Sequence, residues 1–157
     1  MLHAYMLTQS GIPMLYSSDE IGRLNDYSYK EDPDKAADSR YIHRGAFQWE
    51  LAGKRNSKSS VEGQIFQTLS MEQIRSQESV FDKDCDVYTY DVHDDSILCI
   101  LRQKGNERFI GIFNFSDSEK TAWMQEEGTF RDLITGQTLE LKDVVLPAYG
   151  FMWCKRM

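Results

Sequence analysis

Residues Ile97–Phe115, with the sequence ILCILRQKGNERFIGIFNF, have the clearest secondary-structure pattern in the chain. It contains two runs rich in Ile, Leu and Phe, Ile97–Arg102 and Arg108–Phe115. The turn signal Lys104-Gly105-Asn106 separates them. Short apolar and aromatic runs on either side of a glycine-containing turn are typical of β-strands. We therefore expect two neighbouring strands here.

Similar short runs continue on both sides of this stretch. They are Val87–Val92, Lys120–Met124, Thr129–Ile134, Thr138–Leu141 and Tyr149–Lys155. Asp, Asn, Gly and Pro residues mark turns between them. Strands that recur at roughly this spacing, about 8–12 residues, are typical of an antiparallel β-sandwich. The fold class predicted for the chain is therefore mainly β, with the sandwich at the C-terminal end.

The pattern before residue 80 is different. Leu2–Thr8 suits a helix, and Pro13–Tyr16 suits a short buried strand. Residues 17–60 are polar and far exceed the usual connection of about 4–6 residues, which indicates a functional or a disordered segment. Their aromatic residues favour order, and Phe47 with Leu51 allows one short helix. Ser59 and Glu62 then form a capping-box pattern ahead of a helix over Val61–Gln77.

This first part does not make a domain by itself. One buried strand between two helices has no sheet to join, so its apolar faces would be exposed. We therefore expect the 157 residues to be a piece of a longer protein. A swapped or partner-completed assembly is the alternative.

Charge and composition exclude some classes of partner. The net charge is −7, from 18 basic and 25 acidic residues, whereas nucleic-acid binding needs clustered Lys and Arg. No apolar stretch approaches the about 20 residues that cross a membrane. The three cysteines, Cys85, Cys99 and Cys154, follow no metal or disulfide spacing, which favours a reducing, cytoplasmic location. We thus expect no nucleic acid and no membrane among the partners.

Two motifs near the start of the chain carry a resemblance. Gly11-Ile12-Pro13-Met14-Leu15-Tyr16 followed by Asp19-Glu20-Ile21-Gly22 resembles the last barrel strand and following turn of glycoside hydrolase family 13. Asn25-Asp26-Tyr27 and Asp38-Ser39-Arg40-Tyr41-Ile42-His43-Arg44 resemble amylosucrases and the similar sucrose hydrolases within that family.

Two later motifs, Gly63–Gln67 and Gly111–Ser116, resemble the last barrel helix and the terminal domain of the same family. The resemblance implies a C-terminal antiparallel β-sandwich preceded by the last strand, loop and helix of a (β/α)8 barrel. Residues 1–79 would be the barrel fragment, with strand eight, loop eight and helix eight, and residues 80–157 the sandwich domain. The loop would lie at the end of the barrel where such enzymes build active sites.

The resemblance also implies which chemistry is absent from the chain. Retaining enzymes use one carboxylate as nucleophile and one as general acid and base. In this family these residues, and a third aspartate, belong to earlier strands, whose motifs do not occur here. No catalytic residue is therefore expected in this chain. The adjacent Asp19 and Glu20 order the loop in the family, and no cofactor is needed.

The residues predicted to contact or shape the site for sucrose and the acceptor glucan are Arg40, Arg102, Asp38 and Glu31. By resemblance, Arg40 belongs to the loop wall; the alternative is a loop arginine that holds Asp38 or Asp34. Arg102 resembles an arginine that reaches back to the barrel and pairs with an aspartate below the glucosyl pocket; the alternative is a solvated arginine at a strand end. Asp38 and Asp32 match the family, with loop ordering as an equal alternative.

Glu31 departs from the family pattern. Amylosucrases carry a glutamine at this place, on the acceptor side, so a carboxylate replaces an amide that both donates and accepts. The departure puts the acceptor preference in doubt, and a solvent-exposed glutamate is the alternative.

Several other residues have a structural interpretation. His43 and Arg44 are expected to order the same loop. Asp82-x-Asp84-x-Asp86 departs from a calcium loop, because Val87 replaces the glycine at position six, so we expect no metal site. Trp153 is expected in the core, whereas Trp123 could lie in the core or stack on a sugar.

The function implied is that of the C-terminal portion of an amylosucrase-like transglucosidase. The whole enzyme would transfer glucose from sucrose to an α-1,4-glucan, and its partner for this chain would be the N-terminal barrel portion. The alternatives are a sucrose hydrolase, another family 13 α-glucosidase, or a non-catalytic glucan-binding or structural β-sandwich module.

Overall fold

The computed structural model describes all 157 residues, and their contacts divide the chain into two compact units. Unit 1 combines Met1–Pro13 with Ser70–Met157, and unit 2 is Met14–Leu69. Residues 1–13 and 70–79, which the sequence analysis assigned to a barrel fragment, thus pack with the strands. The assignment of residues 1–79 to a barrel and 80–157 to a sandwich stays a prediction.

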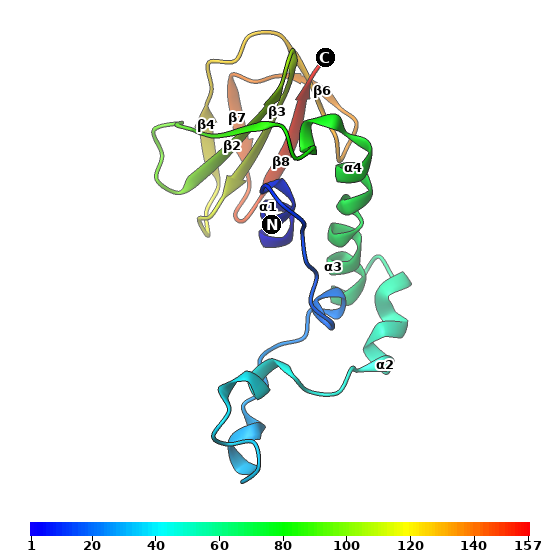
Figure 1. Cartoon of the computed structure of the whole chain (residues 1–157). Helices are drawn as coiled ribbons and strands as arrows, with labels where there is room; N and C mark the ends of the chain where they lie inside the picture. Colours follow the sequence, from blue (N-terminus) through cyan, green and yellow to red (C-terminus); the bar gives the residue numbers. More distant parts are fainter. The chain divides into compact units, whose positions relative to one another are not determined.

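Unit 1 is an antiparallel β-sandwich (Figure 1). Its larger sheet has the strand order β1-β2-β3-β8-β5-β6, and β4 pairs with β7 in a second sheet. The strands are β1 Asp86–Tyr90, β2 Ile97–Lys104, β3 Glu107–Asn114, β4 Lys120–Trp123, β5 Thr129–Asp132, β6 Thr138–Glu140, β7 Asp143–Leu146 and β8 Phe151–Arg156. The mainly β fold class is confirmed.

The opening stretch forms the central hairpin of this sandwich. Lys104 pairs with Glu107, so Gly105 and Asn106 make a two-residue turn between β2 and β3. Gly105 has φ +57°, a left-handed conformation that such a hairpin turn needs and that costs glycine little.

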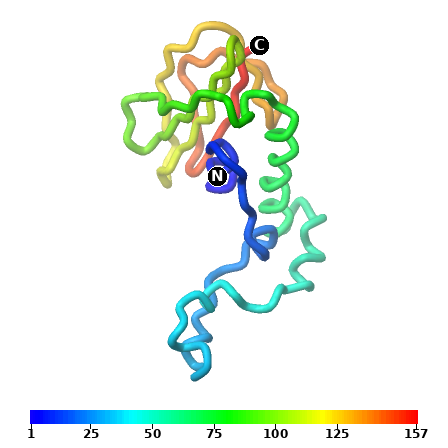
Figure 2. Tube along the Cα trace, in the orientation of Figure 1, coloured from blue at the N-terminus to red at the C-terminus, as the bar shows by residue number.

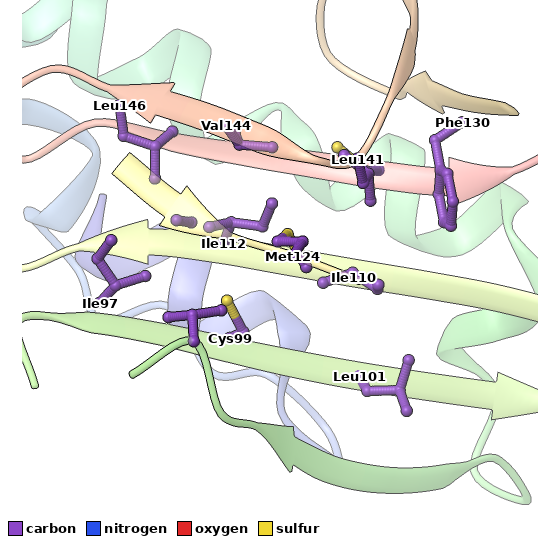
Figure 3. Packing of buried hydrophobic residues seen from close by; sticks show 13 residues of the cluster. Ile97, Cys99, Leu101, Ile110, Ile112, Met124, Phe130, Leu141, Val144 and Leu146 are labelled. Atoms are coloured by element: carbon purple, nitrogen blue, oxygen red, sulfur yellow. The ribbon is translucent and has the colours of Figure 1, made fainter. Parts of the chain in front are cut away.

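Alternate residues of the central strands serve two different cores. Ile110 and Ile112 of β3 pack with β4 and β7 residues such as Val144, as Figure 3 shows. Phe109 and Phe113 point to the opposite face, because side chains alternate along a strand. Burial on both faces explains why the run from Phe109 to Asn114 is continuously buried.

Helices cover this second face of the larger sheet. They are α1 Leu2–Thr8, α4 Met71–Gln77 and the 3-10 turn η5 Ser79–Phe81. Phe81 lies edge-on to Phe109, with ring centroids 4.8 Å apart, and Phe109 lies edge-on to Trp153 at 5.7 Å. The predicted helix over 2–8 and the predicted core position of Trp153 are confirmed. Cys99 and Cys154 are also buried, as expected of free thiols in apolar strands.

One strand was missed by the sequence analysis. β7 pairs with β4 antiparallel, from Lys120 opposite Leu146 to Trp123 opposite Asp143. Its sequence, Asp-Val-Val-Leu, is short, and Pro147 follows directly. Because proline marks a turn, the residues before Pro147 were read as part of that turn and not as a strand. The structure shows that Val144 and Leu146 of this strand are buried.

Unit 2 consists of short helical segments joined by irregular chain. These are η1 Asp19–Ile21, η2 Ser28–Glu31, η3 Ser39–His43, α2 Trp49–Ala52, η4 Gly53–Asn56 and α3 Val61–Leu69. The short helix expected near Phe47 and Leu51 is α2. None of the helices in the chain is long and apolar enough to span a membrane.

Two predictions for the first part are wrong in detail. Pro13–Tyr16 forms no strand, because a strand needs a neighbour to pair with and no other strand of the chain joins it. The helix over 61–77 is interrupted at Ser70 and forms α3 and α4. It begins with Ser60 rather than Ser59, since the Ser60 hydroxyl accepts a hydrogen bond from the Gly63 amide at 2.9 Å.

Candidate functional site

Residues 23–46 of unit 2 form a loop that closes on itself (Figure 2). The Arg23 guanidinium donates from Nη1 to the Ala46 carbonyl oxygen at 2.9 Å. The Asp26 amide donates to the Ile42 carbonyl oxygen at 2.7 Å. A compact loop with close ends and its own internal packing is a common place for function.

Aspartate side chains order the inside of this loop. Asp26 accepts a hydrogen bond from the Ser28 amide at 2.9 Å, and Asp32 accepts one from the Asp34 amide at 3.0 Å. The Lys35 ammonium lies 2.5 Å from Asp32 Oδ2. These local bonds replace the regular secondary structure that the sequence of the loop does not support.

A polar hollow of about 300 Å³ lies on this loop. Its lining consists of Asp26, Ser28, Tyr29, Asp32, Lys35, Tyr41, Arg44, Gly45 and Ala46. Two carboxylates and two cationic side chains balance each other, and two tyrosines add aromatic surface. Such a lining suits a neutral, hydroxyl-rich ligand better than an ion.

Three carboxylates of the loop have a lowered pKa. Hydrogen bonds from Ser28 lower the pKa of Asp26, and the Lys35 ammonium followed by the Asp34 amide lowers the pKa of Asp32. The Arg40 guanidinium lowers the pKa of Asp38 to about 2. An ionised carboxylate only accepts hydrogen bonds, so these groups can receive the O–H donors of a ligand.

Of the loop residues discussed from the sequence, Asp32 lines the hollow, whereas Arg40, Asp38 and Glu31 do not. Arg40 has a side chain that is 66% exposed and pairs with Asp38, which is the alternative that the sequence analysis left open. Asp38 also accepts a bond from the Arg40 amide at the start of η3. Glu31 is exposed at the end of η2, and only Asp32 among the discussed carboxylates of this motif lines the hollow.

Sequence reasoning missed Asp26, Tyr29, Lys35 and Tyr41 as parts of one surface. They come from two turns that only the closure of the loop brings together. The sequence did contain one indication of these turns. Asp26 and Asp32 each stand two positions before a residue whose amide the carboxylate can bind, Ser28 and Asp34, and this spacing is typical of turns capped by an Asp side chain.

Arg102 is buried within unit 1. Its side chain is 1% exposed, so the solvated alternative is wrong. Nε donates to the Val80 carbonyl oxygen at 2.6 Å, Nη1 to that of Thr8 at 2.9 Å, and Nη2 to that of Asp82 at 3.1 Å. In this chain the guanidinium therefore binds backbone rather than a carboxylate.

The Asp19-Glu20 pair orders the chain at the start of the loop. Asp19 accepts a hydrogen bond from the Tyr16 amide at 3.0 Å, whereas Glu20 forms an ion pair with Arg55. The two carboxylates thus have separate partners, in line with loop ordering rather than paired acid–base chemistry.

No group of three or more His, Cys, Asp or Glu side chains in the chain is arranged to hold a metal ion. Asp82 and Asp84, the start of the apparent calcium loop, both pair with Lys104.

The run before the loop exposes apolar side chains. Ile12 is 92% exposed and Met14 is 82% exposed, and Tyr16 is also exposed. Consecutive exposed apolar residues of this kind mark a surface suited to contact with another segment or partner. This is the run that the sequence pattern predicts as a buried strand.

A family model for the β-galactosidase C-terminal domain matches residues 99–151, which lie in the sandwich. The chain also resembles the crystal structure of AmyP in complex with maltose, with a TM-score of 0.77 and 15% identity over 98% of this chain. Two variants of the trehalulose synthase MutB in complex with Tris give a TM-score of 0.71, at 15% and 16% identity, again over 98% of this chain.

The match covers 33% of the AmyP chain and 37% of each MutB chain. This chain thus spans about a third of the length of the solved structures that it matches. At 15–16% sequence identity, the likeness to these structures establishes a shared fold and no shared activity. The chain has the fold of the C-terminal part, with its β-sandwich, of glycoside hydrolase family 13 enzymes.

Proposed function

We propose that the chain is the C-terminal portion of an amylosucrase-type transglucosidase. The whole enzyme would transfer glucose from sucrose to the 4-hydroxyl of an α-glucan and release fructose. The family 13 fold supports the parent class, and the Asp38–Arg44 motif supports the amylosucrase type.

The observation that carries the proposal is the exposed apolar run that leads into a self-closed polar loop. In a (β/α)8 barrel, the last strand is covered by its two neighbours and the loop after it joins the active-site face. Ile12–Tyr16 followed by residues 23–46 has this order, an apolar run first and a polar loop second. The exposure of Met14 then reflects missing neighbour strands.

In this proposal the chain helps to bind sucrose and the acceptor glucan, but it supplies no residue that cleaves the glycosidic bond. A nucleophilic carboxylate of the barrel portion would displace fructose and form a glucosyl ester, while a second carboxylic acid protonates the fructose oxygen. That second group would then take the proton of the acceptor hydroxyl as the ester breaks. Arg40, Asp38, Asp32 and Glu31 would lie along the sucrose and acceptor side and position hydroxyl groups.

The test joins this chain to a barrel portion that carries strands one to seven of an amylosucrase. With sucrose as donor, we expect fructose release and polymer formation from the mixture. Met14→Asp should abolish this gain, because a charge would have to be buried between strands. Release of fructose that is unaffected by the presence of this chain would contradict the proposal.

A sucrose hydrolase is the nearest alternative parent. Glu31 favours this alternative, since a carboxylate on the acceptor side can accept hydrogen bonds from water as readily as from a sugar. The two activities differ in product ratio: a hydrolase yields equal glucose and fructose, whereas a transglucosidase leaves free glucose well below fructose. Glu31→Gln in the mixture should shift the ratio toward transfer.

A non-catalytic glucan-binding module is the second candidate function. Trp123 of β4 is 62% exposed on the outer face of the two-stranded sheet, directly opposite Asp143. An aromatic ring beside a carboxylate can stack on a sugar and accept its hydroxyl protons. Maltoheptaose should then quench Trp fluorescence, and Trp123→Ala should remove the effect while the exposed-tryptophan control Trp49→Ala retains it.

A further inference from the structure

The carbonyl oxygens at the end of α1 are bound by two arginines from elsewhere in unit 1. A helix leaves its last carbonyl groups without partners inside the helix. Arg102 Nη1 donates to the Thr8 carbonyl oxygen at 2.9 Å, and Arg75 Nη1 donates to that of Leu7. α1 has no basic residue in its own last turn, so both cations come from distant sequence.

Arg75 extends this contact beyond the helix. Its Nη1 also donates to the Gln9 carbonyl oxygen at 3.2 Å, and its Nη2 donates to that of Gly11 at 3.0 Å. The one guanidinium therefore follows the backbone from Leu7 to Gly11. These residues lead directly into the exposed run that begins at Ile12.

Arg102 connects the same point to the η5 turn, which covers the same face of the larger sheet. Its other two nitrogens donate to the carbonyl oxygens of Val80, within η5, and of Asp82, directly after it. One buried side chain thus joins the end of α1, the η5 turn and its own strand, β2.

The two guanidinium groups also share the ring of Phe81. Their carbon centres lie 5.5 Å and 5.6 Å from its centroid, within the range of cation–π contact. Burial and then the charge of Arg102 lower the pKa of Arg75. The carbonyl oxygens and the aromatic face offset this cost of placing like charges close together.

We infer that Arg75 and Arg102 are positioning residues that form an arginine clamp on residues 7–11 and fix the course by which the chain leaves the sandwich. In the parent enzyme of the proposed function, the clamp sets where strand eight starts and hence where the loop after it begins. The effect on strand eight rests on the proposed function. The clamp itself follows from the hydrogen bonds within this chain and does not depend on that function.

Local amide exchange separates a clamp from a general contribution to stability. A residue that holds one segment changes the exchange of that segment, whereas a residue that stabilises the whole unit changes every slowly exchanging amide. The experiment follows deuterium uptake of peptides that cover residues 2–12 and 97–114 in the full chain, without any sugar.

We expect Arg75→Met to speed exchange in residues 2–12 by about tenfold or more, because several charge-assisted hydrogen bonds are lost. Exchange in residues 97–114 should stay within about twofold of the unchanged chain. Arg75→Lys, which keeps the charge and loses the fork of donors, should give an intermediate rate. Arg75 is only partly buried, so both variants are expected to fold.

The matched control is Arg108→Met. Arg108 is another partly buried arginine of the sandwich, with Glu126 and Gln103 as partners, and its loss should leave residues 2–12 unchanged. Unchanged uptake over residues 2–12 in Arg75→Met would overturn the inference. Equal acceleration over 2–12 and 97–114 would overturn it as well, and neither result depends on whether the parent acts on sucrose.

Discussion

The Arg40 guanidinium binds the Asp38 carboxylate through two parallel hydrogen bonds, Nε to Oδ1 at 2.8 Å and Nη2 to Oδ2 at 2.7 Å. Asp38 in turn accepts the Arg40 amide, so the pair fixes the start of η3. These bonds use Nε and Nη2 and leave Nη1 for other acceptors. Arg40 can therefore order its loop and still present a donor to a ligand.

Arg40→Gln should raise the pKa of Asp38 from about 2 toward its ordinary value of 3.8. The Arg40 side chain is the largest cause of the lowered pKa, and the backbone amide at residue 40 would preserve part of the effect. Since the folded pKa is depressed, the pair stabilises the loop above about pH 4 and loses this effect as the pH falls toward 2. A carbon-detected NMR titration of the Asp38 carboxyl measures the change, and an unaltered titration in the variant would refute it.

Arg102→Met should lower the free energy of unfolding of unit 1 by about 3–5 kcal/mol. The substitution removes the donor from the buried carbonyl groups of Thr8 and Val80 and from the partly buried carbonyl group of Asp82. Urea unfolding of the chain followed by circular dichroism gives the value. A loss below about 1 kcal/mol would mean that water replaces the guanidinium at no cost.

Thiol reactivity should separate the three cysteines. Burial raises the pKa of Cys99 and of Cys154 to about 12, whereas Cys85 is only partly buried. A thiol reagent at neutral pH should therefore label Cys85 first and reach the other two on the timescale of unfolding. Fast labelling of all three in the folded chain would contradict the burial of β2 and β8.

Ser60→Ala should speed amide exchange in α3 roughly fivefold, the equivalent of about 1 kcal/mol for a lost helix cap. Ser60 Oγ accepts the Gly63 amide and also donates to carbonyl oxygens of Lys54 and Ser57. Ser59→Ala is the matched control, with no expected change in α3. If Ser59→Ala sped exchange in α3 and Ser60→Ala did not, Ser59 would be the cap, as the sequence pattern predicted.

The sandwich was largely predictable from the sequence. Its strands have either alternating apolar and polar residues or a continuous apolar run, and turn residues stand between them. Seven strands were expected near their observed positions, and the missed strand, β7, has only four residues before a proline. The break at Ser70 was not predictable from periodicity, since Leu69 and Met71 are both apolar and both buried on either side of it.

The candidate site was less predictable than the fold. Asp26 and Tyr41 lie fifteen positions apart in a polar segment, and they share a hollow only because Arg23 and Asp26 close the loop. The role of Arg102 in this chain also depends on tertiary structure, because its three acceptors come from residues 8, 80 and 82. Sequence position at a strand end gave no sign of its burial.

Fructose release from sucrose can be measured in three samples: this chain alone, a barrel portion with strands one to seven alone, and their mixture. We predict no release above the uncatalysed rate for this chain alone, and a clear gain in the mixture over the barrel portion. Release that rises with the concentration of this chain alone would contradict the account, because it would require catalytic carboxylates within these 157 residues.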